Sequence, residues 1–150
     1  MKKQAFMVLM TLSLFVTLAA LSVHAQSDTR LNVNIPFEFS ITNHVLPAGE
    51  YTVSRLAQDG QYVLMIRSID CSVNERFLTL PTQARTTPNQ SALVFHQYGD
   101  QYFLSQVWTS GNDTGRELSK PRAENELIRA TSALVKGAAE GQTVSITAHR

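Results

Sequence analysis

Metal-binding and catalytic side chains are few in this sequence, and their spacing fits no common site. Three histidines, His44, His96 and His149, follow residue 25, but no His-x-x-x-His or Cys-x-x-Cys pair is present to hold a metal. Segment 110–115 is rich in oxygen ligands but lacks the spaced acidic residues of a calcium-binding loop, so we expect a turn there. We therefore predict no metal and no cofactor, and a hydrogen-bonded ring in a sheet as the role of His96.

Nucleophilic and acid–base catalysis lack a sequence signature as well. The single cysteine, Cys71, has no neighbouring base or cation to activate its thiol, and no Gly-x-Ser-x-Gly motif surrounds Ser105 or Ser110. The acidic residues are scattered over turns and outward positions, and include Glu38, Glu50, Asp59 and Asp100. We therefore predict that the protein is not an enzyme. A hydrolase of envelope polymers is the alternative, and it would need two of these acids brought together by the fold.

The composition describes one ordinary globular domain. Of the 150 residues 43% are hydrophobic and 17% are charged, and thirteen Lys plus Arg balance twelve Asp plus Glu, for a formal net charge of +1. A disordered chain would contain fewer apolar residues and a larger net charge. A nucleic-acid-binding domain would carry a basic excess, so we expect no nucleic-acid partner.

The first 25 residues have the layout of a signal peptide. Two lysines precede an uncharged, mostly apolar run that ends at Val23-His24-Ala25. We expect cleavage between Ala25 and Gln26, a secreted protein of the periplasm or the extracellular space, and no membrane span afterwards. The run is also long enough to cross a bilayer, which leaves an uncleaved anchor as the alternative. Residues 26–150 would then form one domain with eleven basic and twelve acidic residues, a net charge of −1.

Alternating apolar and polar residues predict the first strand. From Leu31 to Ile41 every odd position is apolar, which indicates one strand with a buried face and a wet face. Pro36 cannot donate a ladder hydrogen bond, so this strand should lie at a sheet edge. Further along the chain we expect a strand over 74–80 and a polar surface loop over 82–90.

A hairpin is predicted around Asp59-Gly60, preceded by a strand that starts after the turn at 47–49. A two-residue turn pairs Gln58 with Gln61. Arg55 then falls on the core face, where it either bends out to water or meets a partner. The other members of that face are Tyr51, Val53, Ala57, Tyr62, Leu64 and Ile66.

A second hairpin is predicted around Gly99-Asp100, with Tyr98 paired to Gln101. Strict alternation gives it two apolar faces, so we expect it at the centre of the fold with its second face covered. One face would hold Leu93, Phe95, Tyr102, Leu104 and Trp108. The other would hold Val94, His96, Tyr98, Phe103 and Val107.

The expected cover is a helix that starts at Pro121 and ends at Gly137, followed by a last strand over 143–147. About seven strands with short turns and one helix indicate a mainly β fold. We predict an antiparallel sandwich or a small barrel.

Three blocks of the chain resemble an uncharacterised family of small exported bacterial β-domain proteins with no assigned function. They are Leu46-Pro47-Ala48-Gly49-Glu50-Tyr51-Thr52-Val53, Tyr98-Gly99-Asp100-Gln101-Tyr102-Phe103-Leu104, and Gly115-Arg116-Glu117-Leu118 through Arg122-Ala123-Glu124. The first block is also similar to turns in immunoglobulin-like and transthyretin-like modules. The resemblance implies export and a β domain, and it implies no activity, ligand or catalytic residue.

Together these features predict a non-catalytic binding or structural module of the cell envelope or extracellular space, with a protein or envelope component as its partner. The sheet edge containing Pro36 is the expected contact surface. The alternative is a barrel-like carrier of a small apolar ligand, lined by Phe95, Tyr102, Leu104 and Trp108. The sequence leaves the oligomeric state open, and a dimer linked through Cys71 is the alternative to a free thiol.

Overall fold

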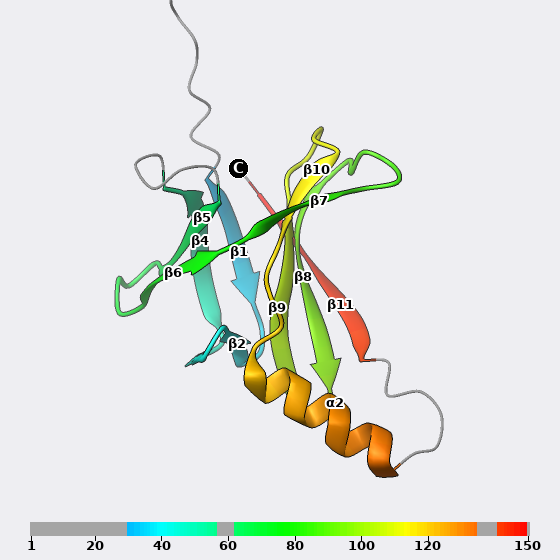
Figure 1. Ribbon diagram of the computed structural model, residues 1–150. Coiled ribbons are helices and arrows are strands. Elements are labelled where there is room, and N and C mark those ends of the chain that lie inside the picture. The colour runs from blue at the N-terminus through cyan, green and yellow to red at the C-terminus, as the bar shows by residue number, and fades with distance from the viewer. Residues whose placement is uncertain (1–29, 57–61, 135–140, 150) are drawn as a thin grey trace, which may run out of the picture.

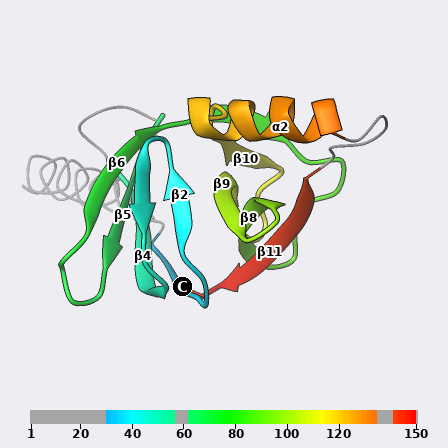
Figure 2. The same cartoon turned by 90° about the horizontal axis from the view of Figure 1, so that it is seen from below.

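The computed structural model describes residues 30–56, 62–134 and 141–149. Within them, eleven strands form two mainly antiparallel sheets that face each other, and one helix lies against the second sheet (Figure 1, Figure 2). The first sheet consists, in order, of β1 (Leu31–Ile35), β4 (Gly49–Arg55), β5 (Val63–Ser68) and β6 (Asn74–Leu78). The second sheet has seven strands, five of which lie in the order β11 (Gln142–Ala148), β8 (Ser91–Tyr98), β9 (Gln101–Trp108), β10 (Thr114–Glu117) and β7 (Leu80–Gln83), while β2 (Phe39–Ile41) and β3 (His44–Leu46) join it beside β9. The predicted mainly β fold is confirmed as a sandwich rather than a closed barrel, with more and shorter strands than expected.

The chain changes sheet near Pro36, so the single strand expected over 31–41 is wrong. Residues up to Ile35 belong to β1, whereas β2 (Phe39–Ile41) pairs with β3 (His44–Leu46) and touches β9 through a parallel bridge from Ser40. The missing N–H of proline ends the first ladder. The alternation still holds across the break because both sheets face the same core, and Ile35, Phe39 and Ile41 are all buried.

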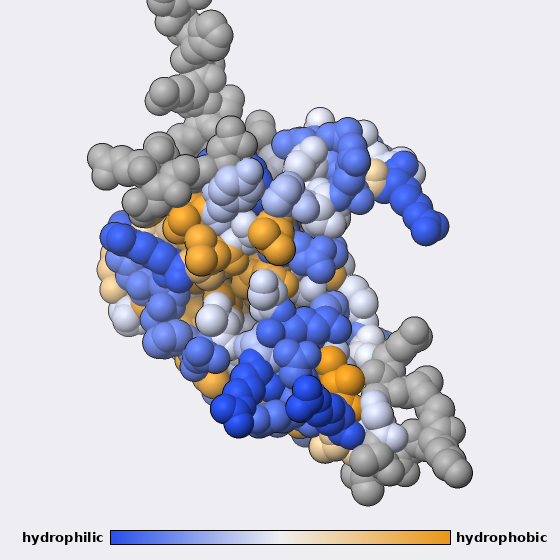
Figure 3. All heavy atoms as spheres, in the orientation of Figure 1, coloured by the Kyte–Doolittle hydropathy of each residue, from blue (hydrophilic) through white to orange (hydrophobic). Residues whose placement is uncertain are grey.

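A second change of sheet joins β6 to β7 through Thr79. The N–H and the hydroxyl of Thr79 both donate to the carbonyl of Tyr62, at 2.7 and 2.9 Å. The expected loop over 82–90 therefore starts later, because β7 extends to Gln83 and includes Pro81. Proline is tolerated there because β7 is an edge strand. Leu78 and Leu80 point outward from the crossing, and Figure 3 shows apolar surface over this part of the molecule.

The β8–β9 hairpin has the predicted register at its turn, with Tyr98 opposite Gln101. A β-bulge then shifts the register between Val94 and Phe95, which inserts one extra residue in β9. Beyond the bulge, Val107 stands opposite Leu93 on the core face and Trp108 lies on the outer face. The sequence prediction of these two side chains was wrong because it assumed unbroken alternation.

Aromatic rings fill the centre of the sandwich. Phe39 makes edge-to-face contacts with Tyr51 and Phe95, with ring centroids 5.4 and 5.5 Å apart. Phe37 meets Phe95 in the same way at 5.3 Å. The Tyr51 hydroxyl donates to the Pro47 carbonyl at 2.6 Å, so this buried side chain leaves no polar atom unsatisfied. The core is therefore packed with side chains where a carrier would need space.

The predicted helix is present as α2 (Arg122–Leu134) and crosses one end of the outer face of the second sheet (Figure 1). Pro121 directly precedes it, and Arg122, Glu126 and Arg129 are exposed as expected. Its expected end at Gly137, the turn at 59–60 and the expected cleavage between Ala25 and Gln26 lie outside the described residues. Within the described chain, no helix has both the length and the apolar character that a bilayer span requires.

Candidate functional site

The three histidines are engaged in separate parts of the fold. His44 is exposed, with its Nδ1 atom 3.5 Å from Glu75 Oε1. His149 forms two backbone hydrogen bonds with Asn32, which connects the end of β11 to the edge of β1. Among the residues that the structure covers, no three His, Cys, Asp or Glu side chains are grouped as a metal ion would need.

His96 is hydrogen-bonded to a neighbour, as predicted, and the partner is a buried acid from α2. Its Nδ1 atom lies 2.7 Å from Glu124 Oε1, and the Tyr98 hydroxyl donates to the same oxygen at 3.2 Å. The pKa of Tyr98 is raised to about 12, mainly by burial and, to a smaller extent, by the charge of Glu124 and the hydrogen bond to it. Glu124 is 1% exposed. This burial could not be predicted from the sequence, because an acid in a first helical turn is usually solvated.

This cluster ties the helix to the sheet. A glutamate that orients a histidine could support general-base catalysis. In the described structure, however, His96 makes no hydrogen bond to a serine, threonine or cysteine side chain that could serve as a nucleophile. Every buried side-chain polar atom there is satisfied. The contact therefore joins α2 to β8 through polar groups that satisfy one another.

Cys71 lies in an exposed turn between β5 and β6, and Asp70 organises that turn. Asp70 Oδ1 accepts hydrogen bonds from the hydroxyls of Ser68 and Ser72 and from the Ser72 N–H. These hydrogen bonds lower the pKa of Asp70, and the bond from the Ser68 hydroxyl contributes most. Cys71 itself has a φ of 60° and contacts the Ile69 carbonyl through Sγ at 3.8 Å. Nothing in this arrangement supports a dimer linked through Cys71.

The Asp70 turn should make stability depend on pH in the acid range. Because the folded protein lowers this pKa from 3.8, the turn stabilises the fold above that value and loses its contribution as the pH falls through the lower folded-state pKa. We expect Asp70→Asn to be less stable than the wild type at neutral pH, with a difference that shrinks below about pH 4. Urea unfolding across this range measures it, with Asp100→Asn as an exposed control. A difference that stays constant with pH would contradict the assignment.

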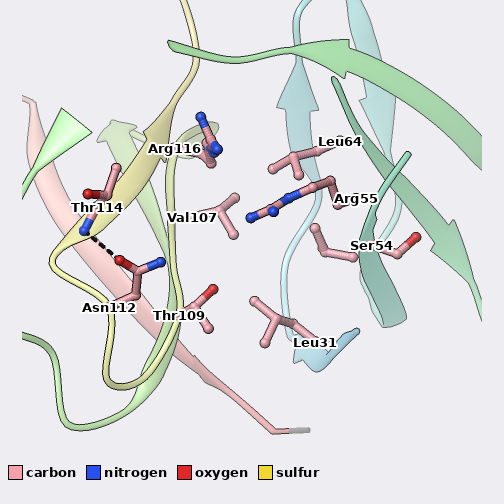
Figure 4. A pocket seen from close by; sticks show the side chains of 10 residues that line it. Leu31, Ser54, Arg55, Leu64, Val107, Thr109, Asn112, Thr114 and Arg116 are labelled. Carbon is pink, nitrogen blue, oxygen red and sulfur yellow. Dashed lines mark hydrogen bonds between the residues drawn. The ribbon is translucent and has the colours of Figure 1, made fainter. Parts of the chain in front are cut away.

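Two arginines from opposite sheets reach into a narrow cleft at one end of the sandwich (Figure 4). Arg55 ends β4 and pairs across the first sheet with Leu64, while Arg116 in β10 pairs across the second with Val107. The pairing of β4 with β5 therefore has the predicted register. As predicted, Arg55 is the charged residue on the otherwise apolar inner face of this hairpin. The cleft has a volume of about 30 Å³. Its apolar floor consists of Leu31, Val53, Leu64 and Val107.

The electrostatics of the cleft are those of two like charges near an apolar surface. The pKa of Arg116 is lowered mainly by partial burial and, to a smaller extent, by the positive charge of Arg55. Tyr62 opposes this effect, and the Arg116 guanidinium carbon lies 5.7 Å from the centroid of its ring. The ion pairs found between described residues involve other side chains, so no described carboxylate neutralises the two arginines.

No family model, curated protein or solved structure matches the chain.

Of the four carboxylates expected to be scattered, the three that the structure describes do not line the cleft. Glu38, Glu50 and Asp100 are exposed, and Asp59 lies outside the described residues. Sequence reasoning missed the cleft as a site, although the arginine on an apolar face was a usable signal. Arg116 gave no signal, because it stands in a run of alternating charges that is typical of a solvated surface.

Proposed function

We propose that the protein is a non-catalytic binding module whose ligand enters the cleft between the sheets. The observation that carries this proposal is that Arg55 and Arg116 enter the cleft from opposite sheets over an apolar floor. Among the described residues, neither arginine forms an ion pair with an acid. Binding sites combine these two features, because apolar walls exclude water while a few placed polar groups orient the ligand. Export to the periplasm or the extracellular space, and membership of the family described above, remain part of this proposal.

The sheet edge containing Pro36 is a weaker contact surface than the sequence suggested. The backbone of Asn32 is already hydrogen-bonded to His149, and Pro36 offers no N–H. A strand added at this edge would find few unpaired backbone hydrogen-bonding groups on β1. A carrier of apolar ligands has less support as well, because Phe95 and Leu104 pack in the core.

The proposal is tested by titrating the purified, ¹⁵N-labelled protein with probes of different chemistry: inorganic phosphate, acetate, N-acetylglucosamine, trialanine and octanoate. We expect at least one probe to shift the backbone amide signals of Arg55, Thr109, Asn112 and Thr114 at the cleft. Shifts confined to core residues such as Phe95 on adding octanoate would favour a carrier instead. Absence of shifts at the cleft with every probe would contradict the proposed function.

A further inference from the structure

We propose that the cleft binds an oxyanion group, a sulfate, phosphate or carboxylate, between the guanidinium groups of Arg55 and Arg116. The inference rests on the proposed function, since it assumes that the cleft is a ligand site, and it adds the chemical class of the ligand.

The first argument is charge. Arg55 and Arg116 line the same cleft from opposite sheets (Figure 4), and the charge of Arg55 contributes to lowering the pKa of Arg116. Among the described residues, the acids that form ion pairs are bound to His44, His96 and Arg122. Two facing cations are unfavourable on their own, and an anion between them converts that repulsion into attraction on both sides. The fold thus brings together a charge pair that a bound anion would complete.

The second argument is hydrogen-bond geometry. Guanidinium groups present planar pairs of N–H donors that match the oxygen spacing of carboxylate, sulfate and phosphate. Two further donors lie on the same wall, the Thr109 hydroxyl and the Asn112 side-chain amide (Figure 4). The Asn112 Oδ1 atom accepts the Thr114 N–H at 3.0 Å, so its NH₂ group is the part left to donate. Donors from both sheets therefore surround one small space.

The third argument is size and environment. The volume of about 30 Å³ is room for one small group rather than a whole molecule. The ligand should therefore present its oxyanion at an end, with the remainder outside the cleft. Next to the arginines, Leu31, Leu64 and Val107 form a buried apolar surface, and charge-assisted hydrogen bonds are stronger beside such a surface than in open water.

The experiment measures the affinity of sulfate, phosphate and acetate for the wild-type protein by ¹⁵N chemical-shift titration, with sodium chloride holding the ionic strength constant. The variants are Arg55→Gln and Arg116→Gln, and Arg129→Gln on the exposed side of α2 is the matched control. We expect at least one of the three anions to shift the Asn112 and Thr114 amides in the wild type. Each cleft variant should weaken that binding by about tenfold or more, and the control should leave it unchanged.

We expect the Arg116 variants to remain folded, so that a loss of anion binding reports on the cleft and not on unfolding. Replacing Arg116 by neutral glutamine removes a partly buried charge that faces another cation, so the variant should unfold at a temperature no lower than the wild type. Arg116→Lys keeps the charge but loses the planar pair of donors, and should fall between the wild type and Arg116→Gln in affinity.

Three results would overturn the inference. If the control weakens anion binding as much as the cleft variants, the attraction is a general effect of surface charge. If a neutral probe shifts the cleft amides and binds equally well to both glutamine variants, the ligand is of another class while the proposed function stands. If no probe shifts the cleft amides, the inference and the proposed function fail together.

Discussion

Replacing Glu124 by leucine is expected to lower the free energy of unfolding by about 3 kcal/mol. Glu124 is the only fully buried side chain among those described in α2. It accepts hydrogen bonds from two groups of β8, His96 and Tyr98. Leucine would bury those donors against a hydrocarbon, and α2 would lose its deepest contact with the sheet. It would also remove an acid from the first helical turn, where the helix dipole favours negative charge.

Urea unfolding measures this loss, and Glu126→Leu is the matched control two positions along the same helix. Glu126 is largely exposed and its partner Arg122 more so, so we expect a change below about 0.5 kcal/mol. Glu124→Gln provides a second readout, because it keeps the side-chain shape and removes the charge. Since that charge is one cause of the high Tyr98 pKa, tyrosine absorbance should titrate at lower pH in this variant. A lower stability with an unchanged Tyr98 titration would contradict the contact.

The sequence predicted those parts of the fold that depend on local pattern. Alternation identified the buried faces of β1 and β4, and the turn residues predicted both hairpin registers. It failed where one residue changes the geometry: Pro36 moved the chain to the other sheet, and the bulge in β9 exchanged the faces of Val107 and Trp108. Neither event leaves a periodic signal, because a strand with one extra residue has the same composition as a regular strand.

The candidate site was less predictable than the fold for a different reason. Arg55 and Arg116 belong to different sheets, and their approach depends on how those sheets pack rather than on any spacing in the chain. The same holds for His96 and Glu124, which come from a strand and a helix. Of these four, only Arg55 and His96 conflicted with their local pattern as polar residues on apolar faces. Such conflicts are where a sequence points to tertiary partners that it cannot identify.

The bulge in β9 leads to a second large effect, at Gly115. Because the bulge turns Trp108 outward, its ring lies directly over Gly115 on β10, where an added Cβ would come within 2.5 Å of ring atom Cε3. The ring is also held by a hydrogen bond from its Nε1 atom to Gln106 Oε1 at 3.0 Å. We therefore expect Gly115→Ala to lower the free energy of unfolding by about 2 kcal/mol, as overpacking does. Urea unfolding measures this change.

The matched control is Gly49→Ala in β4, where the new Cβ would meet Tyr51 at an ordinary 3.7 Å. That change should be neutral or slightly stabilising, because alanine loses less backbone entropy than glycine on folding. A double-mutant cycle with Trp108→Val then isolates the contact, since removing the ring should make Gly115→Ala nearly harmless. If the cost of Gly115→Ala is the same with and without the indole, Trp108 does not cover this glycine. The unbroken alternation that places Trp108 in the core would then describe the hairpin better than the bulge does.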